Sequence, residues 1–253
     1  MSTEPYSKEV FYEVTPPSKR STKHELDDVV RNAIRYGCFH IDVTDSPTGE
    51  EHSSSVAASV YLKTVYPVAV ICHVRTRDHT IMGLTSLIRA CLAWDVEKVL
   101  FVMGEGEAST GVRPSEAIRI AKRIVEHSGS RPAFGLVYDP NKPQTLERKM
   151  EAQPDFLYSG PITSEDHLSD LDRKVKRAGI GLVAGIMPAS ERNQPIFKRI
   201  GVSQMDFELY RSRQDSIASH VFEVADSLTV MSPADEQAGL ILLNKLLKRS
   251  GGT

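Results

Sequence analysis

Ionisable side chains interrupt four apolar stretches that are otherwise typical of buried β-strands. FYEVTPP contains Glu13, FHIDVTD contains Asp42, VAVICHVR contains His73 with Arg75, and VLFVMGE ends in Glu105. Burying a charged side chain on a strand is costly unless another group pairs with it or the protein uses it. One such residue is easily a satisfied core group. Four consecutive strands that each carry one indicate a functional pocket.

These strands belong to an alternating pattern of apolar runs and amphipathic segments. The expected strands span residues 10–15, 39–44, 68–75, 98–104, 131–138, 155–160, 180–187 and 226–231. The expected helices span 24–36, 53–65, 80–94, 114–127, 143–152, 164–178, 193–200 and 235–249, with further helical material at 205–222. Alternating strands and helices predict a parallel sheet.

Eight strand–helix units in 253 residues predict one (β/α)8 TIM barrel that occupies residues 1–253, with short flexible ends. A doubly wound open sheet is the alternative, and the absence of a GxGxxG fingerprint weakens it. Nothing in the composition marks a second domain.

Alternate residues of a barrel strand face inward. The apolar sets suit the helix layer, so the inward residues are the polar ones: Glu13, Asp42 with Thr44, and His73 with Arg75. Active sites of such barrels lie at the carboxyl ends of the strands. We therefore expect these side chains to converge there.

Each of these residues also has a plainer interpretation. Glu13 could form a structural ion pair with Arg75 or Lys19. A lone His73 could be a hydrogen-bonded core histidine, and Asp42 could serve only to orient a neighbour.

Composition argues against several classes of protein. The chain has 31 basic and 33 acidic residues and no concentrated basic block, so nucleic-acid binding is not expected. No apolar run reaches transmembrane length and the polar N-terminus is not a signal peptide, so we expect a cytoplasmic protein without membrane contact. Cys38, Cys72 and Cys91 lack CxxC spacing, which predicts reduced thiols and no metal site.

Five stretches together resemble the methylenetetrahydrofolate reductase family, whose members have a flavin-binding (β/α)8 barrel. They are FYEVTPP, IDVTDSPTG followed by HSSSVAAS, HVRTRDHT, KVLFVMGE and LVAGIMPAS. The five keep the family's order and spacing over about residues 9–192, roughly three quarters of the chain. Each is a weak signal alone, but five in register are fairly specific.

The resemblance implies that Glu13 is a general acid. The acid helps to open the imidazolidine ring of methylenetetrahydrofolate to an iminium ion, and reduced flavin then delivers a hydride to give methyltetrahydrofolate. Burial inside a barrel raises a carboxyl pKa, as this role requires. The implied cofactor is FAD, and the implied partners are a reduced folate-type pterin and an electron donor, either NAD(P)H or a protein.

The resemblance also assigns binding residues. The positions implied to contact FAD are Thr44, His73, Glu105, Tyr138, Arg148 and Lys149, and those implied to bind the pterin are Glu105 and Ser159. Arg148 and Lys149 stand late on an expected helix, where cations suit the helix dipole in any case. The resemblance implies instead that they pair with the FAD diphosphate.

Several positions depart from the family. Glu105 replaces an aspartate, Met103 replaces an arginine, and Ser159-Gly160 replaces a Thr-Gln pair whose glutamine hydrogen-bonds the substrate. Loss of a buried substrate hydrogen bond costs about 1–3 kcal/mol. The region after residue 192 also lacks the family's usual Gly-x-His-x-Tyr ending. These changes leave open a different reduced pterin or a different electron donor.

Two other classes of function stay open. An accessory subunit that binds flavin or a partner enzyme would fit the missing glutamine, whereas the retained Glu13 favours catalysis. A lyase or aldolase needs a lysine at the carboxyl end of a strand or a metal cluster, but Lys98 begins its strand. Segment 205–222 either covers the pocket or contacts another chain, in a homo-oligomer or with a partner subunit.

Overall fold

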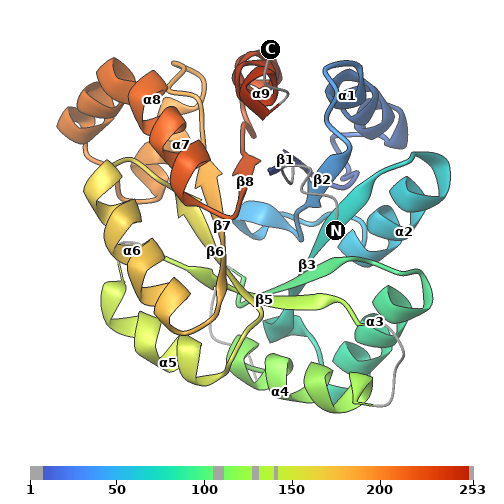
Figure 1. Ribbon diagram of the computed structural model, residues 1–253. Helices are drawn as coiled ribbons and strands as arrows, with labels where there is room; N and C mark the ends of the chain where they lie inside the picture. The colour runs from blue at the N-terminus through green and yellow to red at the C-terminus, as the bar shows by residue number, and fades with distance from the viewer. Residues whose placement is uncertain (1–7, 105–110, 127–130, 140–141, 251–253) are drawn as a thin grey trace, which may run out of the picture.

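A computed structural model of the protein describes residues 8–104, 111–126, 131–139 and 142–250. Eight parallel strands form a closed barrel in which each strand pairs with the next along the chain and the last pairs with the first (Figure 1). The strands are β1 Glu9–Val14, β2 His40–Val43, β3 Ala69–Arg75, β4 Lys98–Val102, β5 Ala133–Tyr138, β6 Phe156–Pro161, β7 Gly181–Ile186 and β8 Ser227–Val230. The predicted TIM barrel is confirmed, and closure between β1 and β8 rules out the open sheet.

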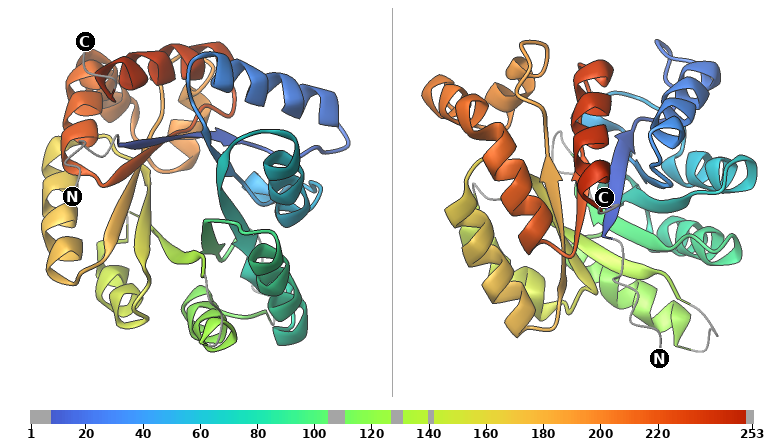
Figure 2. Two further views of the ribbon diagram at one scale, coloured as in Figure 1. Left: turned by 45° about the vertical axis from the view of Figure 1, so that its right-hand side comes forward. Right: turned by 45° about the horizontal axis from the view of Figure 1, so that its top comes forward.

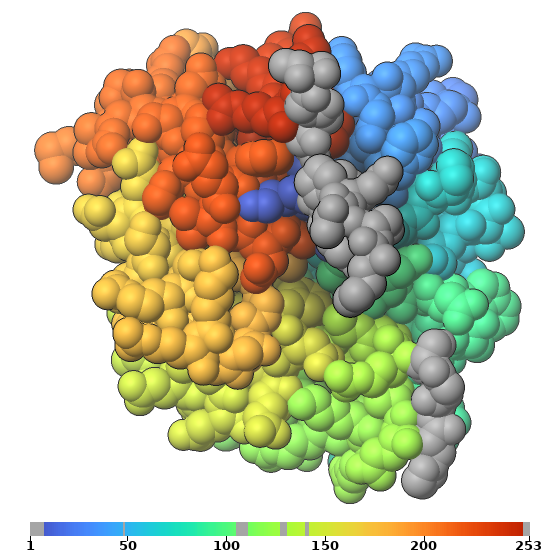
Figure 3. All heavy atoms as spheres, viewed as in Figure 1, coloured from blue at the N-terminus to red at the C-terminus, as the bar shows by residue number. Residues whose placement is uncertain are grey.

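Helices surround the strands on the outside of the barrel (Figure 2). They are α1 Lys23–Arg35, α2 Ser55–Val65, α3 Ile81–Ala93, α4 Pro114–Val125, α5 Leu146–Glu151, α6 Glu165–Arg177, α7 Gln194–Arg199, α8 Gln204–Val224 and α9 Glu236–Ser250. Short 3-10 helices occupy Pro47–Gly49, Thr76–Asp78 and Pro143–Thr145. From α4 to α8 the helices follow one another around the outer surface (Figure 3).

Two of the differences between predicted and observed elements concern segments that carry or adjoin predicted site residues. The helix expected at 143–152 is a 3-10 turn followed by the six-residue α5. The strand expected at 98–104 ends at Val102, because Gly104 has a φ of 82° and a Cβ at this residue would lie 2.4 Å from the Arg75 side chain. A left-handed residue in so close a contact has to be glycine.

Segment 205–222, which the sequence predicts to be helical, lies within the 21-residue helix α8. It packs on α6 and also contacts α7, α9, β7 and β8. None of the helices in the described part of the chain is long and apolar enough to cross a membrane.

Side chains fill the middle of the barrel. Phe11, Ile71, Leu100 and Phe156 point inward from four strands and are almost fully buried. Gly135 on β5 makes room for the Phe156 ring, because a Cβ at Gly135 would lie 2.3 Å from it. The barrel is therefore a packed core with its polar groups at the two ends.

Lys98 lies at the amino end of the barrel. Its Nζ is 2.6 Å from Glu9 Oε2, and Ser227 Oγ donates to the same oxygen at 2.9 Å. Lys98 is thus held in a structural ion pair at the end of the barrel opposite to the expected site, where it could not form a Schiff base with a substrate.

We expect Gly135→Ala to lower the free energy of unfolding by about 1–3 kcal/mol, because the added methyl group overpacks the core. Gly181→Ala is the matched control, since a Cβ on Gly181 would lie 3.5 Å from its nearest neighbour. Urea denaturation of both variants measures the difference. Equal losses of stability would contradict the proposed packing role of Gly135.

Candidate functional site

Five polar side chains face inward at the carboxyl end of the barrel. The strand register fixes their direction: Glu13 pairs with Asp42 between β1 and β2, and Thr229 on β8 pairs with Gly185 on β7. His73 on β3 and Tyr158 on β6 complete the group. The predicted convergence of polar residues from the first three strands is therefore observed, and β6 and β8 contribute as well.

Asp42 is at the centre of this group and is fully buried. Its Oδ2 accepts hydrogen bonds from the hydroxyl groups of Tyr158 and Thr229, the latter at 3.0 Å. Its Oδ1 is 2.7 Å from His73 Nε2. These contacts from β3, β6 and β8 hold the Asp42 side chain in place at the centre of the group.

Glu13 is partly exposed and lies beside this carboxylate. Burial and the charge of Asp42 raise the pKa of Glu13 to about 8, although His73 and a hydrogen bond with Tyr158 act in the opposite direction. Glu13 therefore keeps its proton near neutral pH. A carboxylic acid in this state is able to act as a general acid.

His73 is also set by this cluster. Burial opposes its charge, but its interactions with Asp42 act in the opposite direction, and on balance the pKa of His73 is raised. Its ring meets that of Tyr158 edge to face, with 5.4 Å between centroids. Burial and the two nearby carboxylates raise the pKa of Tyr158 well above its usual range, so this hydroxyl acts as a hydrogen-bond donor.

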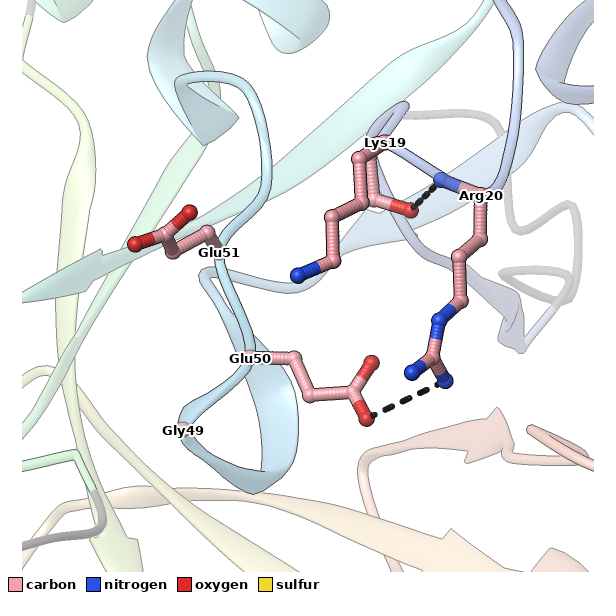
Figure 4. Close-up of a pocket in the computed structure, with 6 residues that line it drawn as sticks. Lys19, Arg20, Gly49, Glu50 and Glu51 are labelled. Atoms are coloured by element: carbon pink, nitrogen blue, oxygen red, sulfur yellow. Dashed lines mark hydrogen bonds and ion pairs between the residues drawn. The ribbon is translucent and has the colours of Figure 1, made fainter.

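Lys19 stands on the loop that follows β1. It projects into a cavity of about 250 Å³ at the rim of the barrel, between the loops that follow β1 and β2 (Figure 4). Glu50 and Glu51 line the same cavity, and Arg20 lies 3.8 Å from Glu50. The charged groups that set the pKa of Glu13 are Asp42 and His73, so the alternative of a Glu13–Lys19 ion pair is not observed among the described residues.

A family model for methylenetetrahydrofolate reductase matches residues 3–134, just over half of the 253 residues. The chain belongs to the methylenetetrahydrofolate reductase family. Membership confirms the resemblance of the motifs around Glu13, Thr44 and His73, all of which lie within the matched segment. The comparison with curated proteins gives no significant match.

Solved structures of low sequence identity share the fold. A protein from Clostridium thermocellum, described as binding two copies of 5-methyl-5,6,7,8-tetrahydrofolic acid, has a TM-score of 0.68 and 15% identity, with 96% of each chain covered. Deoxyribose phosphate aldolase from Aeropyrum pernix has a TM-score of 0.55 and 14% identity, covering 96% of this chain and 90% of its own. The GH99 endo-alpha-mannosidase from Bacteroides thetaiotaomicron has a TM-score of 0.61 and 12% identity, and the match covers 92% of this chain and 82% of the mannosidase chain. At these identities the likeness concerns the barrel alone.

Thr44 and Lys149, two of the residues predicted to contact FAD, lie near the carboxyl end of the barrel. Each is within hydrogen-bond distance of another group of the same chain. Thr44 Oγ1 is 3.3 Å from both the Val14 carbonyl oxygen and Thr15 Oγ1. Lys149 Nζ donates to the Val137 carbonyl oxygen at 2.6 Å, from α5 to the end of β5. Arg148 is exposed on the same helix.

Two other predicted site residues point away from the Asp42 cluster. Tyr138 follows the inward Val137 on β5 and faces the helix layer. Burial raises the pKa of its hydroxyl group, and charged residues of α6 also act on that pKa. Ser159 is fully buried in an irregularity of β6, and its Oγ accepts a hydrogen bond from the Gly185 amide at 3.1 Å. Their assigned contacts with flavin and pterin remain predictions. Glu105 lies outside the described residues.

Sequence reasoning missed two members of the cluster and undervalued a third. Tyr158 and Thr229 were not candidates, although each stands at an inward position of a predicted strand. Asp42 was expected to face inward and, on its plainer interpretation, only to orient a neighbour. The alternation of inward and outward residues within 155–160 and 226–231 could have identified both positions as inward. Tyrosine and threonine are common in strands, so neither residue type suggested a polar site.

The raised pKa of Glu13 predicts a pH-dependent effect of Glu13→Gln on stability. The folded-state pKa lies above the unfolded value, so ionisation of Glu13 increasingly disfavours the folded state as pH rises towards about 8. The thermal midpoint of the variant, relative to wild type, should therefore rise between about pH 5 and about pH 9. One pKa unit corresponds to about 1.4 kcal/mol, or roughly 2–6 °C for a domain of this size.

Glu9→Gln is the control for this measurement. Glu9 is on the same face of β1, but its bonds with Lys98 and Ser227 outweigh burial and lower its pKa. Its contribution to stability is therefore present at neutral pH and is lost only as pH falls. A constant difference between Glu13→Gln and wild type over the whole range would contradict a raised pKa at Glu13.

Proposed function

We propose that this protein reduces a 5,10-methylene-tetrahydropterin of the folate type to the 5-methyl form, with Glu13 as the general acid. The observation that carries the proposal is the place of Glu13: an acid that holds its proton near neutral pH, at the carboxyl end of a barrel of the methylenetetrahydrofolate reductase family. Catalytic groups of such barrels occupy that end.

The proposed task of Glu13 is a single proton transfer. Its carboxylic acid gives a proton to a ring nitrogen of the substrate, the adjacent carbon–nitrogen bond breaks, and the one-carbon unit becomes an iminium ion. The electron pair of the broken bond stays on the protonated nitrogen. An acid with a pKa close to the working pH is suited to this step, because it is protonated beforehand and still able to transfer the proton.

The chain has residues that fit the diphosphate of a flavin. Lys149 is half-buried, and burial together with repulsion from Arg148 and Lys142 lowers its pKa, even though Asp139 acts against this. Its hydrogen bond goes to an uncharged carbonyl group. Such a poorly compensated cation beside the exposed Arg148 suits an anionic group. A flavin bound there would supply the hydride that converts the one-carbon unit to a methyl group.

The pterin class of substrate is supported by the family and by the C. thermocellum protein of the same fold, which is described as binding a methylated tetrahydrofolate. The region that should refine this choice has changed in this chain. A Cβ on Gly160 would meet nothing within 4 Å, so there is open space where the family has a glutamine. Met103, in place of an arginine, is 45% exposed.

These changes favour a second candidate, a protein that binds a methylated pterin or a partner enzyme without catalysing its reduction. The loss of the amide at Gly160 removes a substrate contact but leaves Glu13 in place. A binding protein would not require a protonated acid, so replacement of Glu13 distinguishes the two candidates.

We expect Glu13→Gln to lower the rate of reduction of methylenetetrahydrofolate by about 10²–10⁴-fold, the usual range for loss of a general acid. Reduction of bound flavin by the electron donor, followed by its visible absorbance, should stay within about threefold of wild type. Glu9→Gln, at the other end of β1, should keep both activities. Turnover by Glu13→Gln near the wild-type rate would refute the assignment.

Arg148→Ala should weaken FAD binding by about tenfold, which corresponds to the loss of about 1.4 kcal/mol from one charge-assisted contact. Titration of the purified protein with FAD, monitored by quenching of flavin fluorescence, measures the effect. Arg35→Ala on α1 is the control, because Arg35 is also exposed and, among the described residues, its side chain bonds within its own helix, to Asn32. If wild type binds no flavin, the proposed mechanism fails.

A further inference from the structure

Asp42 is a fully buried carboxyl group at the carboxyl end of the barrel, with polar neighbours on three other strands. Its partners come from three strands: His73 from β3, Tyr158 from β6 and Thr229 from β8. A buried carboxylate costs several kcal/mol unless such partners compensate it. The family resemblance gives Asp42 no role, and the proton transfer proposed for Glu13 does not use it directly.

Glu13 and Asp42 are direct partners in the register of β1 and β2 and face the same side of the sheet. Two carboxyl groups in such proximity do not ionise independently, because each charge disfavours the other. The two hydroxyl donors and the imidazole approach Asp42. The titratable groups around Glu13 are Asp42, His73 and Tyr158, from β2, β3 and β6.

We propose that Asp42 is a positioning residue whose carboxylate, fixed by Tyr158, Thr229 and His73, keeps the neighbouring Glu13 protonated. The inference concerns the acid of the proposed reaction and rests on that proposal for its functional consequence. Asp42 itself exchanges no proton with the substrate. Its charge decides which of the two carboxyl groups is the acid.

Asp42→Asn keeps the size of the side chain and removes the charge. Titration of the protein without substrate, by ¹³C NMR of labelled glutamate carboxyl carbons, measures the midpoint of Glu13 directly, and its signal is identified by its absence in Glu13→Gln. The wild-type midpoint is expected at about 8. In Asp42→Asn it should fall by at least about one pH unit, a tenfold rise in acid dissociation constant.

Asp27→Asn is a closely matched control. Asp27 is also a buried carboxylate that accepts hydrogen bonds from two tyrosine hydroxyl groups, those of Tyr61 and Tyr66, but it lies on α1 outside the barrel. Its replacement should leave the Glu13 midpoint unchanged. If Asp42→Asn shifts the midpoint no more than Asp27→Asn does, burial alone protonates Glu13 and the proposal is overturned.

Thr229→Val provides a second variant should Asp42→Asn lose cooperative thermal unfolding. It removes one donor from Asp42 and leaves both carboxyl groups in place. Asp42 Oδ2 then has one hydrogen-bond donor fewer to fix it beside Glu13, so the Glu13 midpoint should again fall, by less than in Asp42→Asn. An unchanged midpoint in a folded Thr229→Val would count against the role given to the hydroxyl donors.

The titration separates this proposal from the proposed function. A lowered midpoint in Asp42→Asn supports the role of Asp42 even if the protein reduces no pterin. If the protein does reduce methylenetetrahydrofolate, the pH at which kcat declines should move down in Asp42→Asn together with the NMR midpoint. Turnover with an unmoved midpoint would overturn only the role of Asp42.

Discussion

The placement of two carboxyl groups side by side on β1 and β2 is the constraint on which the rest of the site depends. Glu13 and Asp42 are register partners, so any shift in the pairing of these strands would separate them. A slip of one residue would turn Glu13 towards the helices and would place Val14 in the barrel interior instead. Closure of the barrel through β8 prevents such a slip and also brings Thr229 to Asp42.

The sequence predicted the architecture well because its signals were local and repeated. Apolar runs and amphipathic segments alternate eight times, and each polar residue at an inward position could be recognised within its own strand. The inward direction of Glu13, Asp42 and His73 followed from alternation alone. The barrel then converts three separate local patterns into one cluster, since neighbouring strands bring their carboxyl ends together.

The parts that sequence reasoning missed depend on contacts across the barrel. Tyr158 reaches Asp42 from a strand that follows it by more than a hundred residues, and Thr229 does so from β8. Neither residue belongs to a recognisable sequence motif. The role of each hydroxyl group depends on its acceptor, Asp42, which lies on a distant strand. The environment of Ser159 was also not predictable from its own strand. Its hydroxyl group accepts a hydrogen bond from the Gly185 amide at an irregularity of β6. Strict alternation of inward and outward residues does not predict such an extra residue.

Two glutamates on β1 show why residue type alone does not define a catalytic acid. Glu9 and Glu13 are four residues apart on the same inward face, and both are partly buried. Lys98 and Ser227 lower the pKa of Glu9 against the effect of burial, so Glu9 is a carboxylate and forms a structural ion pair. At Glu13, burial and the charge of the neighbouring Asp42 raise the pKa instead. One strand thus carries an anion at its amino end and an acid at its carboxyl end, and the difference comes from the neighbouring strands. A protonated glutamate beside a buried aspartate satisfies the electrostatic requirement of a proton donor without any change in the fold of β1 itself.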